Sequence, residues 1–226
     1  MAIRAQALQS AAAGREVDLD LVKAGELINA AWQEHVASWR GGELYGSLGA
    51  ARWLAAKLQI VDDEEAFISE LTEGLQTAVK RSGTREVDGA ADILSVLRAA
   101  GIATALICDT GMTPGRIIRE LLDYHGIELD HYMFSDEVGI PKPSPKIFET
   151  ALAATGAAPE RAIHIGDLRR TDIAGARSAG MATVRFIGVH DDGHSNEATI
   201  GDEDTIGDEA DAILESWPDL PALLGL

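Results

Sequence analysis

Two aspartates follow an apolar run in the C-terminal half of the sequence. The run, residues 162–165, has the pattern of a buried strand, and Gly166 and Asp167 come directly after it, where a helix rich in alanine and glycine containing Asp172 begins. Such a pair stands at the carboxyl edge of a parallel strand, where open α/β sheets bind ligands. Carboxylate oxygens there suit Mg²⁺, which adds water and substrate phosphate. The same letters also fit a helix cap at Asp167 and a solvated helix residue at Asp172.

A lysine between two prolines is the second feature with chemical potential. Lys142 lies between Pro141 and Pro143 in residues 139–145. The prolines restrict the backbone to extended geometry, so the lysine is held stiffly in its loop. An ammonium fixed in this way can neutralise a phosphate and a carboxylate that attacks it. The alternative is an ordinary exposed lysine in a proline-rich loop.

The elements that must position these residues alternate between helix and strand. Before residue 86 the periodicity predicts only helices, at 1–13, from 18 or 20 to about 39, at 47–58 and at 62–80. Beyond it, helices are expected at 90–100, 114–124, 144–155 and 171–179, with strands at 102–108, 132–134, 162–165 and 182–187. A short edge strand at 212–214 and a helical turn at 219–224 complete the pattern. This alternation predicts a parallel sheet covered by helices on both faces.

Composition narrows the class of protein. The 226 residues carry a formal net charge of -18, which disfavours nucleic acids and anionic membranes as partners. Hydrophobic residues at 46% and charged residues at 25% are typical of a globular protein. The single cysteine, Cys108, excludes an intrachain disulfide and indicates the cytoplasm. No stretch is apolar for the length of a membrane span. The acidic segment 190–211 is expected to be a solvated surface loop.

The motifs at 139–145 and 166–172 resemble those of the haloacid dehalogenase superfamily, whose members are mostly Mg²⁺-dependent phosphatases. The resemblance covers residues 87–224, and the helical block before them is similar to that family's inserted cap. In the family's fourth motif the acidic pair, here Asp167 and Asp172, holds Mg²⁺, with the first residue usually a direct ligand.

The resemblance implies an α/β fold with a Rossmann-like parallel sheet and an inserted α-helical cap. The cap would comprise residues 15–85, and the α/β core residues 1–14 and 86–226.

Residues 106–111 resemble the second motif, in which a hydroxyl at the end of a strand binds the phosphoryl group. Here Cys108 and Asp109 stand where the family has Ser or Thr and often Asn, so Thr110 and the backbone around Gly111 would take over phosphate contacts. The thiol donates weakly, and a carboxylate beside phosphate repels it unless Mg²⁺ or Lys142 compensates. Cys108 is not expected to be a nucleophile, because no histidine adjoins it in sequence and buried cysteine is usually inert.

The family's first motif, a strand that ends in Asp-x-Asp and supplies the nucleophile, has no good match. Asp18-Leu19-Asp20 fits the letters, but no apolar strand precedes it, so both aspartates are expected to cap the next helix. In family members a helix like residues 1–13 follows the nucleophile strand. The resemblance therefore implies that this first, central strand is missing from the sequence. The unpaired edges so left would favour association with another chain, a homo-oligomer included.

The resemblance implies a parent enzyme that hydrolyses a small phosphorylated metabolite through an aspartyl-phosphate, with Mg²⁺ as cofactor and this chain impaired. Lys142 would be catalytic, Asp167 and Asp172 would hold the metal, and residues 108–111 would bind substrate. Two alternatives stay open. One is metal-free dehalogenation of a halogenated metabolite, which the acidic pair disfavours, and the other is an inactive scaffold that binds an anion or a protein.

Overall fold

The computed structural model describes residues 1–189 and 210–226, so the acidic loop expected at 190–211 lies almost wholly outside the described residues. The chain divides into two compact units. The first comprises Met1–Thr84 with Thr110–Leu121, and the second comprises Arg85–Asp109 with Leu122–Leu226. Among the helices of the described residues, none combines the length and apolarity that crossing a membrane requires.

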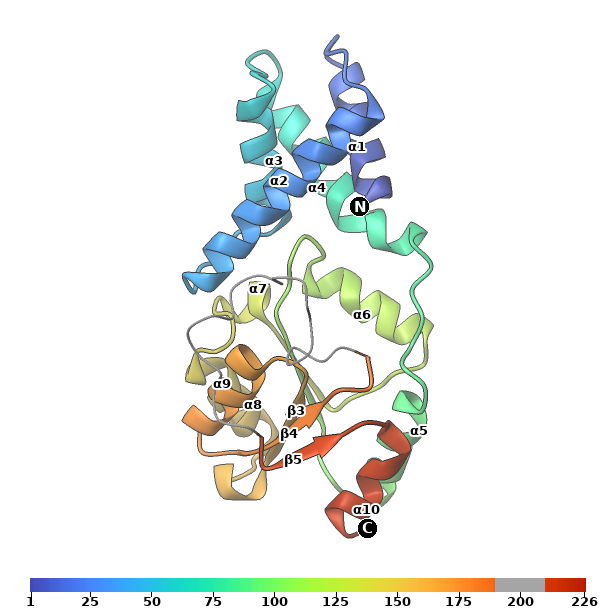
Figure 1. Ribbon diagram of the computed structural model, residues 1–226, viewed down its shortest axis with the longest axis vertical. Helices are drawn as coiled ribbons and strands as arrows, with labels where there is room; N and C mark the ends of the chain where they lie inside the picture. The colour runs from blue at the N-terminus through green and yellow to red at the C-terminus, as the bar shows by residue number, and fades with distance from the viewer. Residues whose placement is uncertain (190–209) are drawn as a thin grey trace. The chain divides into compact units, whose positions relative to one another are not determined.

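The first unit is built from helices (Figure 1). They are α1 (Ala2–Ala13), α2 (Leu21–Arg40), α3 (Gly46–Lys57), α4 (Glu64–Thr77), the 3₁₀ helix η1 (Ala78–Arg81) and the first part of α6 (Gly115–Tyr124). Their apolar faces enclose a core that includes the fully buried side chains of Leu8, Ile28, Leu54 and Phe67. The helical block predicted before residue 86 is present.

The N-terminal helix belongs to this helical unit. α1 packs against α2 and α4, and Leu8 and Ala12 are completely buried in the shared core. The sequence-based division instead grouped residues 1–14 with the α/β core. The difference arises because the small apolar face of α1 fills the space between two longer helices, a choice of partner that periodicity does not encode.

The Asp-x-Asp stretch lies between α1 and α2 and not in a strand. Asp20 is the N-cap of α2, and its Oδ1 accepts a hydrogen bond from the backbone N–H of Lys23 at 2.7 Å. Asp18 is exposed, while Leu19 between them is buried in the helical core. The predicted capping role is therefore confirmed for Asp20. For Asp18 it is wrong, because α2 begins only at Leu21.

The second unit alternates helices and strands as predicted. Its elements are α5 (Ala90–Ala99), β1 (Ala105–Cys108), β2 (His131–Phe134), α7 (Ser135–Val138), α8 (Pro145–Thr155), η2 (Pro159–Arg161), β3 (Ile163–Gly166), η3 (Arg169–Ile173), α9 (Ala174–Ser178), β4 (Ala182–Phe186), β5 (Ala212–Leu214), η4 (Trp217–Asp219) and α10 (Leu220–Leu224). Each predicted strand is found, and β1 and β4 are shorter than the apolar runs that predicted them.

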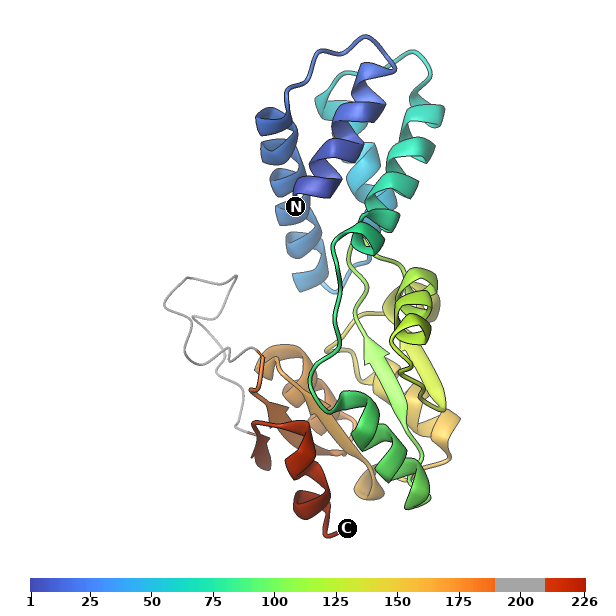
Figure 2. The ribbon, with the colours of Figure 1, turned by 90° about the vertical axis from the view of Figure 1, so that its right-hand side faces the viewer.

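The strands form two parallel sheets within the described residues, with orders β1-β2 and β3-β4-β5 (Figure 2). Helix α8 packs on β1 and β2 of one sheet and also contacts α9, which lies between β3 and β4 of the other sheet in the sequence. Its Phe148 ring meets the ring of His164 from β3 edge-on, with centroids 5.0 Å apart. A separate apolar cluster packs α5 and α10 against β4 and β5. The unit is thus a parallel α/β fold, as the sequence predicted, with its strands in two sheets.

Two aspartates fasten neighbouring chain segments where strands begin. Oδ2 of Asp130 accepts hydrogen bonds from the N–H and hydroxyl of Thr104, at 2.7 and 2.9 Å. Oδ2 of Asp211 is bonded in the same way by Thr183, at 2.8 and 2.9 Å. These backbone and hydroxyl hydrogen bonds lower the pKa of both carboxyl groups, because they stabilise the ionised form.

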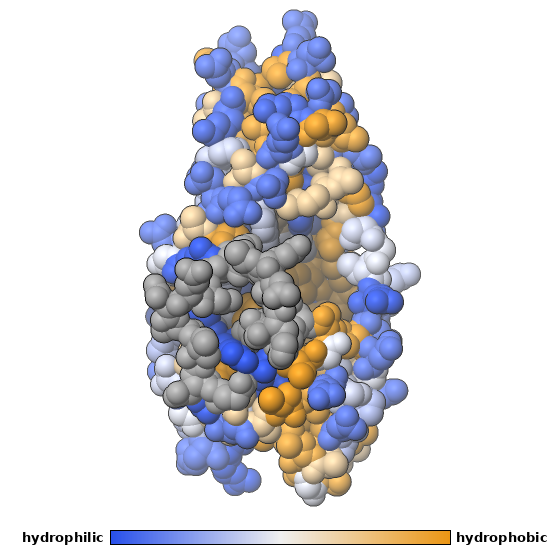
Figure 3. Space-filling view, viewed as in Figure 1, coloured by the Kyte–Doolittle hydropathy of each residue, from blue (hydrophilic) through white to orange (hydrophobic). Residues whose placement is uncertain are grey.

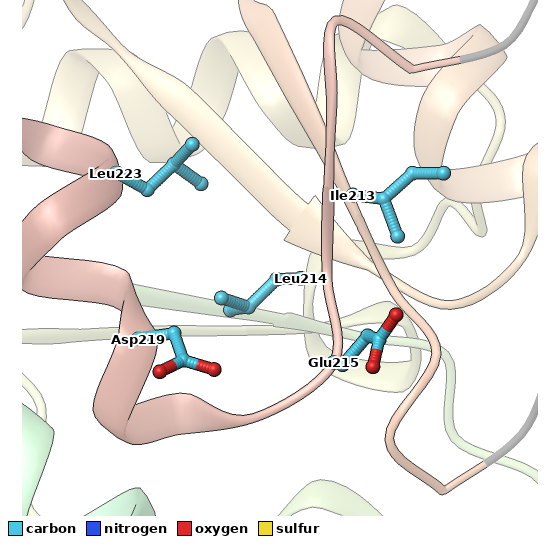
Figure 4. Close-up of a pocket in the computed structure, with 5 residues that line it drawn as sticks. All are labelled: Ile213, Leu214, Glu215, Asp219 and Leu223. Atoms are coloured by element: carbon cyan, nitrogen blue, oxygen red, sulfur yellow. The ribbon is translucent and has the colours of Figure 1, made fainter.

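Apolar surface gathers over the C-terminal elements, at the lower right of Figure 3. Exposed apolar side chains there include Ile213 of β5 and Leu223 and Leu226 at the C-terminal end. A cavity of about 360 Å³ is lined by Ile213, Leu214, Glu215, Asp219 and Leu223 (Figure 4). Among the described residues, those that line this cavity include none of the candidate catalytic, substrate-binding or metal-binding residues predicted from the sequence.

Candidate active site

The turn that follows β3 buries Asp172. In the π-helical turn η3 the N–H groups of Asp172 and Ile173 both donate to the carbonyl oxygen of Leu168, at 2.8 and 3.3 Å. The N–H of Leu168 in turn donates to Oδ2 of Asp172 at 3.2 Å. A Cβ on Gly166 would stand 2.3 Å from Cγ of Asp172, so only glycine leaves room for the carboxylate. The wide turn thus folds Asp172 back over the end of β3, and such turns are frequent at functional sites.

Lys142 joins the ends of β1 and β3. Its Nζ donates to Oδ1 of Asp172 at 2.7 Å, and its backbone N–H donates to Oδ1 of Asp109, the residue after β1, at 2.9 Å. The side chain is 12% exposed. Burial opposes the ammonium charge, but the carboxylates of Asp172 and Asp109 outweigh it and raise the pKa of Lys142. The lysine therefore carries a fixed positive charge between two strand ends.

His164 was not singled out from the sequence, yet it is the third member of this cluster. It lies on β3, is 8% exposed, and its Nε2 lies 2.9 Å from Oδ1 of Asp172. Phe148 of α8 packs edge-on against its ring. The available signal was a polar residue at a buried position of the apolar run 162–165. A buried histidine needs a partner, and the nearest carboxylate is that of Asp172.

The charge of Asp172 is set by these neighbours. Burial alone would raise its pKa, but the Lys142 ammonium and the hydrogen bond with His164 outweigh burial and hold the pKa well below its usual value. Asp172 is only 2% exposed. The carboxylate is consequently ionised at neutral pH although it lies in the interior.

The carboxylates at the end of β3 offer oxygen atoms of the kind that Mg²⁺ prefers. A carboxylate offers about four acceptor positions. Lys142 and His164 contact Oδ1 of Asp172 and Leu168 contacts Oδ2, which leaves one position on Oδ2. Asp167 directly follows β3 and is partly exposed. No group of three or more His, Cys, Asp or Glu arranged for a metal occurs among the described residues. Mg²⁺ commonly takes only one or two protein carboxylates, a number that Asp167 and Asp172 can supply without a larger cluster.

Cys108 lies at the end of β1 in the α/β unit. Burial, only partly offset by Lys142, raises the pKa of its thiol to about 11. The thiol is therefore protonated at neutral pH and is a poor nucleophile, in agreement with the sequence-based expectation.

Thr110 and Gly111 belong to the packing of the helical unit, although they follow Asp109 directly. Thr110 is buried at 6% exposure. A Cβ on Gly111 would lie 3.1 Å from Cζ3 of Trp32. Of the predicted site residues, the α/β unit brings together Asp109, Lys142 and Asp172. Thr110 and Gly111 belong to the helical unit, where Gly111 lies against α2.

Comparison with known proteins identifies the family of this chain. The profile of the haloacid dehalogenase-like hydrolases matches residues 4–180, which is most of the sequence. The chain belongs to this family. The predicted superfamily and its Rossmann-like α/β fold are thereby confirmed.

Curated relatives in the haloacid dehalogenase-like family include two phosphatases. Glyceraldehyde 3-phosphate phosphatase of Pyrococcus furiosus is 42% identical over 106 residues, which are 45% of this chain and 42% of that protein. Phosphoserine phosphatase of Thermus thermophilus is 37% identical over 116 residues, 48% of this chain and 45% of that protein. The chain thus matches less than half the length of either relative.

Among solved structures, the chain resembles a phosphatase of the haloacid dehalogenase family from Thermococcus onnurineus. The TM-score is 0.65 at 18% identity, over 99% of this chain and 88% of that one. This likeness supports the family's fold.

Proposed function

We propose that this chain binds the phosphoryl group of a small phosphorylated metabolite with the help of Mg²⁺, and that its parent activity is phosphate-ester hydrolysis. The observation that carries the proposal is the bridge that Lys142 makes between Asp109 and Asp172. A buried ammonium between two strand ends offers the positive charge that a phosphate dianion requires in a strongly acidic protein.

Each residue has a separate task. Asp167 would hold the cation, with Asp172 contributing its remaining acceptor position, and the bound metal would withdraw charge from the phosphoryl oxygens. Lys142 neutralises the phosphate, and His164 and Asp172 keep its ammonium in place. The hydroxyl of Thr110 and the backbone N–H groups around Gly111 donate to the phosphoryl oxygens, while Asp109 and the protonated thiol of Cys108 line the pocket. The cytoplasm remains the predicted compartment.

The substrate class follows from the two phosphatase relatives. Both are named for phosphate monoesters with three-carbon skeletons, glyceraldehyde 3-phosphate and phosphoserine. Small monoesters of this kind are therefore the first candidates for this chain. The aspartyl-phosphate mechanism needs an attacking carboxylate, and Asp18 and Asp20 lie between helices, so turnover by this chain is expected to be negligible.

The test separates binding from turnover. Isothermal titration with inorganic phosphate should show binding in the presence of Mg²⁺ and clear weakening when EDTA removes the metal. Assays of phosphate release from the two named esters should give rates near the uncatalysed reaction. Release of chloride from a 2-chloro acid at a rate that EDTA does not change would instead support the dehalogenase hypothesis. Absence of phosphate binding with and without Mg²⁺ would contradict the proposal.

A further inference from the structure

The segment after β1 is built into the helical unit. Met112 is 2% exposed and lies in the apolar core formed with α1 to α4. The guanidinium of Arg4 in α1 donates to the hydroxyl of Thr113 at 3.0 Å. The chain passes from the α/β unit to the helical unit between Asp109 and Thr110. The proposed phosphate loop is therefore anchored by helices from Thr110 onward.

Two side chains of α2 lie directly on Gly111. A Cβ at this position would stand 3.1 Å from Cζ3 of Trp32 and 3.3 Å from Nε2 of His35. The rings of Trp32 and His35 lie 4.9 Å apart between centroids, and His35 is 8% exposed. Unlike many glycines of this chain, Gly111 does not have a positive φ. An alanine at 111 would therefore meet limited space and not an unfavourable backbone conformation, and the rings would have to shift by a few tenths of an ångström to admit its methyl group.

A third ring, that of Tyr45, lies near His35. Tyr45, just before α3, has its ring 6.2 Å from that of His35. A Cβ on Gly49 of α3 would meet the Tyr45 ring at 2.9 Å, so the ring also lies tightly on that helix. Burial raises the pKa of Tyr45 to about 12, so the ring stays neutral. A continuous line of close contacts thus runs from α3 through Tyr45, His35 and Trp32 to Gly111.

We propose that Trp32 and His35 are positioning residues for phosphate binding, acting through the backbone of Thr110 and Gly111. The inference rests on the proposed function and extends it. Backbone N–H groups stabilise an anion only when they are held in place before it arrives. The rings of Trp32 and His35 hold Gly111 within the helical unit to which all three residues belong. The packing of α2 thereby sets the affinity for phosphate.

The test adds a methyl group at residue 111, against the Trp32 ring, and then shortens that ring to make room for it. Gly111→Ala should raise the dissociation constant for inorganic phosphate, measured with Mg²⁺, by roughly tenfold or more, since small displacements of binding groups are costly. Adding Trp32→Phe to this variant removes part of the indole and should recover most of the affinity. Gly25→Ala is the matched control, because nothing lies within 4 Å of a Cβ on this α2 glycine.

Stability measured alongside affinity distinguishes positioning from a merely structural role. Trp32→Phe removes buried surface, so the double variant should unfold at lower urea than Gly111→Ala and yet bind phosphate more tightly. Amide hydrogen exchange at 110–113 should rise in Gly111→Ala and fall again in the double variant.

The outcomes separate the two proposals. Wild-type protein that binds no phosphate overturns the proposed function and the positioning role together. Wild-type protein that binds phosphate, with Gly111→Ala indistinguishable from it, overturns the positioning role alone. Affinity that follows stability across all the variants, with no recovery in the double variant, also overturns that role.

Discussion

Asp172 lies directly over Gly166, so closely that a Cβ at residue 166 would stand 2.3 Å from its Cγ and 2.6 Å from its Oδ1. The π-helical turn between the two residues brings the carboxylate of Asp172 back to the end of β3. The hydrogen bonds of Asp172 to Lys142 and His164 depend on this close approach.

Replacement of Gly166 by alanine tests that relationship. Gly166→Ala should lower the free energy of unfolding by about 1–3 kcal/mol, because the added methyl overpacks a site without free space. Urea denaturation followed by circular dichroism measures the change. Gly25→Ala should not destabilise the protein, since nothing lies within 4 Å of a Cβ at this helix-interior position and a helix favours alanine over glycine. Equal stability of Gly166→Ala and wild type would show that Asp172 does not sit over β3.

Removal of the Asp172 charge should be more damaging than removal of a surface carboxylate. Asp172→Asn leaves Lys142 buried without its ion-pair partner, at a cost of about 3–5 kcal/mol in the free energy of unfolding. The control is Glu128→Gln, which breaks the exposed pair with Arg98 and should change stability by less than about 0.5 kcal/mol. Similar small effects of both substitutions would mean that the interior pair is absent.

Stability should fall in acid, and the sign follows from the direction of the pKa shifts. The pKa values of Asp172, Asp130 and Asp211 are lowered in the folded protein, so the unfolded chain binds more protons in acid. The stabilisation is complete above about pH 5 and is lost as the pH falls below about 4 toward the folded values. The free energy of unfolding measured against pH should therefore decline in that range.

Asp172→Asn should flatten this decline, because the residue with the most strongly buried carboxylate no longer titrates. Lys142 acts in the opposite sense. Its pKa is raised by Asp172, so its contribution is retained through neutral pH and lost only as the pH rises through the folded pKa, above about 10.4. An acid profile for Asp172→Asn that runs parallel to the wild-type profile would contradict the assigned interaction.

Cys108 should react slowly with alkylating agents in the folded protein. Burial raises the pKa of its thiol to about 11, so the rate of iodoacetamide labelling should still be increasing with pH above pH 9, the range in which an ordinary thiol is already ionised. Mass spectrometry of labelled protein measures the rate. A plateau near neutral pH would instead identify a reactive thiolate and reopen a nucleophilic role.

The local elements were accessible from the sequence for identifiable reasons. Gly101 and Gly156, both with positive φ, end the helical patterns before the strands β1 and β3. Pro145 begins α8 where proline costs no hydrogen bond. The periodicity of apolar residues and the residue types at turns are local properties of the sequence. They were therefore sufficient to predict nearly all helices and strands of the described residues.

The contacts between distant segments could not be predicted in this way. The π-helical turn exists because Asp172 packs over Gly166 and meets His164, none of which changes the periodicity of the helix that was expected there. Likewise, Met112 looks like part of a strand-end loop but is buried in the helical core. The side to which a loop attaches is decided by the surface that covers it, and this information lies far away in the sequence.

Phosphate binding by a lysine variant tests the central claim most directly. Lys142→Met keeps an unbranched side chain, one atom shorter, and removes its charge. Lys146→Met does the same to an exposed lysine on α8. With Mg²⁺ present, isothermal titration should show that wild type and Lys146→Met bind phosphate. The dissociation constant of Lys142→Met should be at least tenfold higher, a loss of about 1.4 kcal/mol in binding free energy. Equal affinity in all three proteins, each confirmed to be folded, would contradict the claim that Lys142 grips the phosphate.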